Sequence, residues 1–143
     1  MGEENLNFRA KDLVTLEQNF RRNFINSLSG YKSVNLVGTI DKNNKTNLAI
    51  FNTIIHIGSS PALMGLLIRP PVVPRHTLNN ILEMGCFTIN HINPTIYHKA
   101  HQTAARYKKE DKSEFDIVGL TPHYSDALKA PYVGESTVKI GLE

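Results

Sequence analysis

The sequence predicts a mainly β protein of the α+β class, in which antiparallel strands form a barrel with flanking helices. The apolar pattern changes from helical spacing to alternation at Ser33, and strand-like stretches then follow one another across short turns. Such hairpins, without regular alternation of strands and helices, are typical of antiparallel sheets and barrels. A length of 143 residues, with 41% hydrophobic and 20% charged residues, favours one domain, 1–143.

Residues 1–30 are expected to form a helical lead-in to this domain. Thr15 and Gln18, three positions apart, match a capping box, which marks the start of a helix. The apolar residues that follow at helical spacing are Phe20, Phe24, Ile25 and Leu28. We therefore expect one amphipathic helix that ends near Gly30.

Three strands are expected next. Residues 33–40 alternate, and the turn-forming residues 41–45 predict a hairpin. Residues 46–57 are almost continuously apolar, which predicts one long strand covered on both faces. After a break at 58–61, a third strand is expected at 62–68.

The proline-rich run 70–74 can form neither a helix nor a central strand. Thr77 is a good N-cap for a short helix that Gly85 would end. Residues 86–92 then predict a fourth strand. Its cysteine, Cys86, is the only one in the chain, and a packed thiol is favoured over a nucleophile.

The remaining segment is expected to begin with a helix and to end with a strand. Asn93 can cap that helix, with Pro94 at its first position. From Glu110 the pattern becomes irregular, which predicts a loop until a strand at 136–142. The apolar anchors of the expected loop are Phe115, Ile117, Val118 and Leu120.

Charge and hydropathy indicate an anionic ligand more than a nucleic acid or a membrane. The formal net charge is +3 and the pI is near 9.0, but the one cationic run, 106–109, is followed at once by Glu110 and Asp111. No stretch approaches the roughly 20 apolar residues that span a bilayer, and residues 1–5 do not resemble a signal peptide. We expect a cytoplasmic protein.

Polar side chains gather at the ends of the predicted strands. Asn52 and Thr53 interrupt an apolar strand, Arg69 ends the next one, and Arg75 and Thr77 lead into a helix. Guanidinium groups, a hydroxyl and the free N–H groups of a helix N-terminus together bind phosphate. The equally weighted alternative is that Thr77 only caps its helix and the arginines are solvated.

Two further sets of polar side chains are candidates, one for binding a ligand and one for binding a metal ion. Asn90, inside an apolar strand, can bind a ligand or the backbone of a neighbouring strand, and the structural role is slightly favoured. His91, His98 and His101 lie close together in the sequence, but no cysteine or suitably spaced carboxylate accompanies them. We therefore predict no metal site, and no catalytic acid or base is named.

Several segments together resemble the flavin reductase-like family. They are residues 33–39, 46–53, Pro61 with its following strand, 75–81 and 85–91. The resemblance covers residues 31–120, and its most telling parts are the asparagine-led second strand and the helix that leads to Phe87-Thr-Ile-Asn. It implies an FMN-binding split β-barrel that works as a homodimer, with FMN at the dimer interface.

The resemblance also implies a set of cofactor-binding residues. By position, Asn52, Thr53 and Ile54 would face the isoalloxazine ring, while Arg75 and Thr77 would bind the phosphate. The cofactor-binding candidates are therefore Asn52, Thr53, Ile54, Arg69, Arg75, Thr77 and Asn90. Members of the family continue for several dozen residues beyond the point that matches Glu143, which raises the expectation of a C-terminally truncated product.

The implied reaction is hydride transfer from NAD(P)H to flavin, followed by electron transfer to a downstream acceptor. The protein would mainly position two rings and exclude water, because the cofactor carries the chemistry. Two alternatives stay open: a flavin-binding electron carrier without its own nicotinamide site, and a binding domain on the same barrel that uses no flavin.

Overall fold

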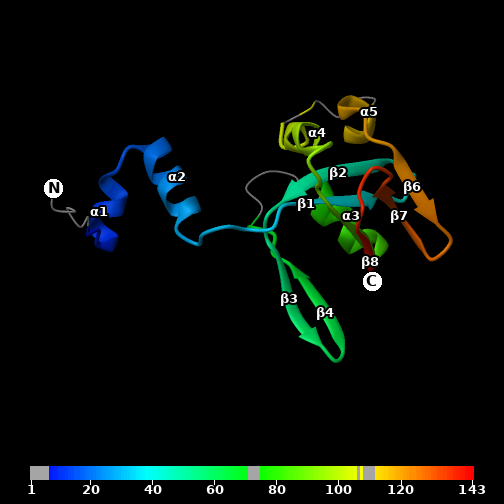
Figure 1. Ribbon diagram of the computed structural model, residues 1–143, viewed down its shortest axis with the longest axis horizontal. Coiled ribbons are helices and arrows are strands. Elements are labelled where there is room, and N and C mark those ends of the chain that lie inside the picture. The colour runs from blue at the N-terminus through cyan, green and yellow to red at the C-terminus, as the bar shows by residue number, and fades with distance from the viewer. Residues whose placement is uncertain (1–6, 71–74, 106, 108–111) are drawn as a thin grey trace. The chain divides into compact units, whose positions relative to one another are not determined.

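The computed structural model describes residues 7–70, 75–105, 107 and 112–143 (Figure 1). Two earlier predictions fall partly outside these ranges: the proline-rich run, of which 71–74 are not described, and the cationic run at 106–109. The chain divides into two compact units, Met1–Lys32 and Ser33–Glu143, and each is described by itself.

The first unit holds two short helices, α1 (Ala10–Thr15) and α2 (Gln18–Ser27), where the sequence predicted one. The predicted capping box is wrong, because the Glu17 carboxylate caps α2 by accepting hydrogen bonds from the N–H groups of Asn19 and Phe20 at 2.9 and 2.8 Å. These bonds lower the pKa of Glu17 below its ordinary value. The aromatic face of α2 is not buried within the described part of this unit.

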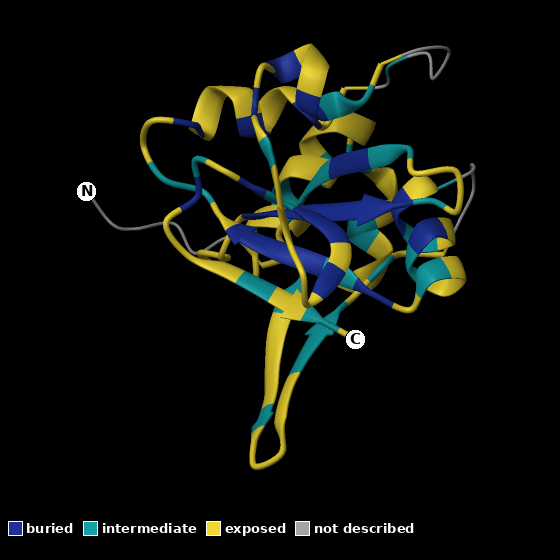
Figure 2. Ribbon diagram, turned by 90° about the vertical axis from the view of Figure 1, so that its right-hand side faces the viewer, coloured by how far each residue is buried: buried dark blue, intermediate teal, exposed yellow. Residues whose placement is uncertain are grey.

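The second unit is built on a four-stranded antiparallel sheet in the order β2-β1-β5-β8. Its strands are β1 (Asn35–Ile40), β2 (Thr46–Phe51), β5 (Phe87–His91) and β8 (Lys139–Leu142). Every residue of β1 is buried, because other elements cover both faces of the sheet (Figure 2). The predicted strands at 33–40, 86–92 and 136–142 are thus present with slightly shorter limits.

The predicted long strand at 46–57 is wrong, because the chain bends at Asn52 and starts a second hairpin. This hairpin consists of β3 (Ile54–Ser59) and β4 (Ala62–Leu66), and it projects away from the four-stranded sheet (Figures 1 and 2). Ile55 and Ile57 are 55% and 59% exposed, so β3 is not covered on both faces as expected.

The prediction of a loop after Glu110 is also wrong for the described residues from 112 onward. It contains a one-turn helix, α5 (Glu114–Val118), and a third hairpin, β6 (Pro122–Ser125) with β7 (Leu128–Val133). Ser113 caps α5 by accepting from the Phe115 N–H, and Phe115 is 1% exposed. β7 packs against β1 and β5, where the Thr88 hydroxyl donates to the Pro131 carbonyl at 2.7 Å.

Two longer helices complete the unit. α3 (His76–Met84) ends at Gly85, whose φ of 70° places it in the left-handed region that glycine adopts easily, as predicted. Its N-cap is Arg75, so Thr77 lies in the first turn and is not the cap. α4 (Tyr97–Gln102) begins later than expected, because the Asn93 side chain accepts from Thr95 and forms a turn instead of a cap.

Side-chain alternation decides what covers each face of the sheet. α3 packs on the face that carries Thr39 of β1, where the Asn80 amide reaches the Thr39 hydroxyl. The opposite face carries the main core, formed by Leu36, Leu48, Ile96, Ala100, Phe115, Val118, Leu120 and Val133.

Cys86 is a buried, packed thiol beside Leu128 and Ala130, as expected. Within the described ranges, no helix is long and apolar enough to cross a membrane.

Glu135 joins the end of β7 to the start of β6. Its carboxylate accepts from the Thr121 N–H at 3.0 and 3.1 Å and from the Thr121 hydroxyl at 2.9 Å. Partial burial acts to raise the pKa of Glu135. The hydrogen bonds from Thr121 and from its own backbone, together with the charge of Lys99, outweigh that effect and hold this pKa below its ordinary value.

A lowered pKa in the folded state means that the ionised Glu135 stabilises the fold above its ordinary pKa of 4.5, and that this contribution is lost as the pH falls through the folded pKa. We expect Glu135→Gln to lower the free energy of unfolding by about 1 kcal/mol at pH 7 and by much less at acidic pH. Urea denaturation at both pH values measures the difference. Glu83→Gln, which breaks only an exposed pair with Lys42, is the control and should change little. A Glu135 effect that does not vary with pH would contradict this linkage.

Candidate functional site

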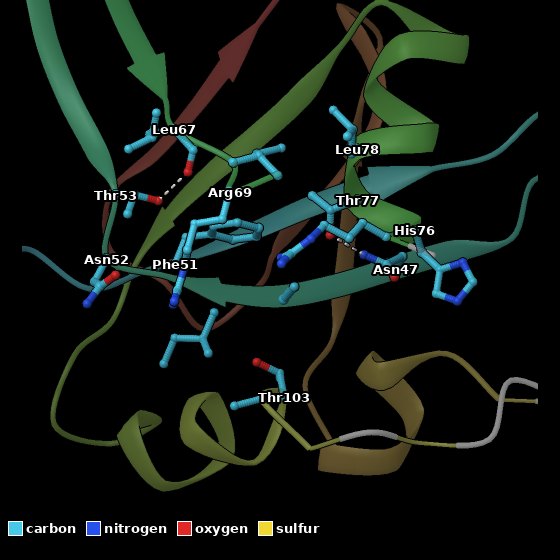
Figure 3. A pocket seen from close by; sticks show the side chains of 15 residues that line it. Asn47, Phe51, Asn52, Thr53, Leu67, Arg69, His76, Thr77, Leu78 and Thr103 are labelled. Atoms are coloured by element: carbon cyan, nitrogen blue, oxygen red, sulfur yellow. Dashed lines mark hydrogen bonds between the residues drawn. The ribbon is translucent and has the colours of Figure 1, made fainter. Parts of the chain in front are cut away.

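A pocket of about 420 Å³ lies beside the edge strand β2 (Figure 3). Its walls are Asn47 and residues 49–53 of β2 and the following bend, residues 67–69 after β4, residues 75–78 at the start of α3, and residues 103–104 after α4. One side is therefore aliphatic and aromatic, and the other is the N-terminal end of a helix. Pockets of this size and composition commonly hold small organic ligands.

The α3 end of this pocket carries hydrogen-bond donors that have no acceptor in the part of the chain that the structure describes. The Arg75 Nε is buried and has no partner within the described part of the chain, and its side chain does not cap α3. The first intrahelical bond runs from the Asn79 N–H to the Arg75 carbonyl, so the N–H groups of Thr77 and Leu78 lie ahead of the helical ladder. Such an end binds anions.

Thr77 is 6% exposed and takes part in a buried polar cluster. Its Oγ1 accepts a hydrogen bond from the Asn47 Nδ2 at 3.1 Å (Figure 3). The alternative that Thr77 only caps its helix is thereby excluded, because its side-chain oxygen faces β2 and not the backbone of α3.

The opposite end of the pocket is formed where β2 gives way to the second hairpin. The Thr53 hydroxyl donates to the Leu67 carbonyl at 2.7 Å (Figure 3), and the Leu67 N–H donates to the Thr53 carbonyl at 3.0 Å. These two bonds fix the bend at Asn52, whose side chain is exposed. Phe51 and Ile50 supply a half-buried apolar wall.

Two of the predicted binding residues do not line this pocket. Ile54 lies on the hairpin and lines a separate hollow with Asn35 and His91. Asn90 is fully buried on the other face of the sheet: its Nδ2 donates to the Leu36 carbonyl at 3.1 Å and to the Thr88 hydroxyl at 3.0 Å.

The Oδ1 of Asn90 accepts from the Val133 N–H at 2.9 Å, so both ends of its amide are engaged within the fold. The structure therefore assigns Asn90 the structural role and corrects its placement among the cofactor-binding candidates. The other five candidates line one pocket: Asn52, Thr53, Arg69, Arg75 and Thr77.

Sequence reasoning missed Asn47, Phe51 and Thr103 as pocket residues. Asn47 carries a usable signal, because it is a polar residue inside an otherwise apolar strand and is 4% exposed in the fold. Phe51 and Thr103 carry no such signal, since an aromatic residue in a strand and a threonine after a helix are common in any fold.

The fold and pocket define a class of protein: an antiparallel β domain with a projecting hairpin, in which the N-terminal end of a helix borders a partly apolar pocket. Residues 31–143 match the model of the flavin reductase like domain, and the chain belongs to that family. The predicted family and its split-barrel fold are thereby confirmed.

Solved structures agree with this membership. A Shewanella frigidimarina protein assigned as a flavin reductase with a split barrel domain is 50% identical, with a TM-score of 0.89, over 96% of this chain and 67% of that chain. The flavoredoxin of Desulfovibrio vulgaris is 28% identical, with a TM-score of 0.68, over 80% and 63% of the two chains. Component B of nitrilotriacetate monooxygenase from Bacillus cereus, at 18% identity and a TM-score of 0.82 over 98% and 68%, shares the fold.

A curated relative from Aquifex aeolicus, an uncharacterized protein, is 27% identical over 109 residues. That match covers 75% of this chain and 55% of the relative, so the chain spans about half the length of the curated protein that it matches.

Proposed function

We propose that this protein is an FMN-dependent oxidoreductase that passes hydride from NADH or NADPH to flavin, and from there electrons to a downstream acceptor. One observation carries the proposal: the buried Arg75 Nε, which has no acceptor among the described residues, at the end of a pocket that Thr77 also lines. A buried donor of this kind is costly unless a ligand satisfies it.

The residues at the α3 end fit the phosphate of FMN. The Arg75 guanidinium would offer a charge-assisted hydrogen bond, the Thr77 hydroxyl a neutral one, and the N–H groups of Thr77 and Leu78 the positive end of the helix. Arg69, which is exposed at the rim, would add charge without a fixed contact.

The β2 side of the pocket fits the isoalloxazine ring. Ile50 and Phe51 offer apolar surface, while the exposed Asn52 amide at the bend can meet the polar edge of the ring. When bound, the flavin supplies the hydride chemistry, and the contribution of this chain is to position the ring and to exclude water.

The proposal includes a homodimer. The projecting hairpin exposes Ile55, Ile57 and Leu63 at 55%, 59% and 48%, and an isolated two-stranded hairpin is only marginally stable in water. A second copy that covers these side chains would remove them from solvent. Sedimentation velocity should show a dimer for the wild-type protein, and Ile57→Asp should shift the monomer–dimer equilibrium towards monomer. A wild-type protein that stays monomeric at all concentrations would contradict this part.

The donor is tested by anaerobic titration of the FMN-loaded protein. We expect NADH or NADPH to bleach the flavin absorbance within the time of catalytic turnover. If dithionite bleaches the bound flavin but neither nicotinamide does so, the protein is instead a flavin-binding electron carrier. A protein that gains no thermal stability from FMN would support the third reading, a domain that uses no flavin.

A further inference from the structure

Four polar side chains form a closed layer between the sheet and α3. They are Thr39, Asn47, Thr77 and Asn80, with exposures of 0%, 4%, 6% and 5%. Thr39 and Asn47 are opposite each other in the β1–β2 register, and the other two are in α3. Only Thr77 and Asn47 of this layer also line the pocket.

The donors and acceptors in the layer have a definite order. The Asn47 Nδ2 donates to Thr39 Oγ1 at 3.3 Å and to Thr77 Oγ1 at 3.1 Å, which uses both of its N–H bonds. Asn80 Nδ2 donates to the same Thr39 oxygen at 3.1 Å. Thr39 therefore accepts twice and has no lone pair left for a proton from Thr77.

The order at Asn47 fixes the role of the Thr77 hydroxyl. A hydroxyl that accepts from an amide N–H must direct its own proton elsewhere, and the amide oxygen of Asn47 points away from this bond. Thr77 and Arg75 both line the pocket, and no described residue accepts the Thr77 proton, so this proton is available to a ligand there. The Thr77 hydroxyl then faces a ligand in the pocket as a donor, as the Arg75 guanidinium does.

We propose that Asn47 is a positioning residue that holds the Thr77 hydroxyl as a donor and so makes the site select a phosphate ester over an alcohol. The inference rests on the proposed function, because it concerns the phosphate end of the same pocket. A phosphate dianion offers only acceptors, whereas the terminal hydroxyl of riboflavin brings a proton and no charge. FMN and riboflavin differ only at the phosphate, so their affinity ratio reports the phosphate end of the pocket, and the change in that ratio on substituting Asn47 reports the part that depends on Asn47.

The test measures the dissociation constants of FMN and riboflavin by fluorescence titration for the wild type, Asn47→Leu, Thr77→Val and the double variant. We expect Asn47→Leu to reduce the preference for FMN about 5- to 10-fold, and to have less than a 2-fold effect when Thr77→Val is already present. The riboflavin constant should stay nearly unchanged throughout.

Asn80→Leu is the matched control, since it also removes a buried amide that donates to Thr39 but makes no hydrogen bond to Thr77. It should lower the melting temperature as much as Asn47→Leu while keeping the FMN preference of the wild type. If Asn47→Leu does not fold, Asn47→Ser, which keeps a small polar side chain, replaces it in the same cycle.

Three outcomes are distinguishable. Loss of the preference in Asn47→Leu but not in Asn80→Leu, with no further loss beyond Thr77→Val, supports the inference. Equal loss in both asparagine variants, or an undiminished effect of Asn47→Leu in the Thr77→Val background, overturns it. A wild type that binds FMN and riboflavin equally overturns the phosphate site itself, and with it the proposed function.

Discussion

Arg75→Ala is expected to weaken FMN binding by about 10- to 100-fold. The guanidinium borders the pocket with a buried Nε that no described residue pairs with, so its hydrogen bond to a phosphate would form away from bulk water. Hydrogen bonds to charged groups contribute about 1.5–3 kcal/mol, and each 1.4 kcal/mol is tenfold in affinity. Fluorescence titration with FMN measures the effect.

Arg69→Ala is the control for charge alone. Arg69 lines the same pocket but is exposed, so its interaction is screened by water and salt, and we expect only a few-fold loss that disappears at high salt. Riboflavin affinity should be the same in both variants. An Arg75 variant that loses riboflavin and FMN binding equally would place the phosphate elsewhere.

Phe115→Ala is expected to lower the free energy of unfolding by about 3–5 kcal/mol, the usual range for deleting a buried phenyl ring. Phe115 is 1% exposed and belongs to the main core with Leu36 and Leu48. α5 has only five residues, so packing and not helix propensity holds it in place. Urea denaturation followed by circular dichroism measures the change.

Ile117→Ala provides the comparison within the same helix. Ile117 is 38% exposed, and its truncation should cost under about 1 kcal/mol because little buried volume is lost. Equal destabilisation by the two variants would mean that α5 does not pack on the sheet through Phe115.

The sheet was predictable where local pattern and tertiary pairing agree. β1 alternates in sequence, is followed by turn-forming residues 41–45, and pairs with β2 through every residue from Asn35 to Ile40. The break at Asn52 was not predictable, because Ile54, Ile55 and Ile57 continue the apolar, β-branched pattern of β2. Only the pairing of β3 with β4 decides that a new hairpin starts there.

The segment after residue 110 shows a different reason for failure. α5 is too short for helical periodicity to appear, and β6 has only four residues, with three of them exposed. Both elements depend on contacts far along the chain, such as that between Glu135 and Thr121 for β6. A single sequence without these contacts looks irregular.

The site was predictable to the extent that its residues mark element ends. Arg75 and Thr77 precede or begin a helix, where an anion is favoured, and that pattern is visible in the sequence. The location of the Asn90 side chain was not predictable from the sequence, because the register of β5 against β1 decides the face of the sheet on which it lies. Asn47, on the opposite face, is next to Thr77 for the same reason.

The most direct test of the central claim is a comparison of FMN and riboflavin binding to the purified wild-type protein. FMN should be retained through desalting with the absorbance bands of protein-bound flavin, and riboflavin should bind at least 10-fold more weakly, because it cannot satisfy Arg75. Equal affinity for the two flavins, or no binding of either, would contradict the claim that this pocket holds the phosphate end of a flavin nucleotide.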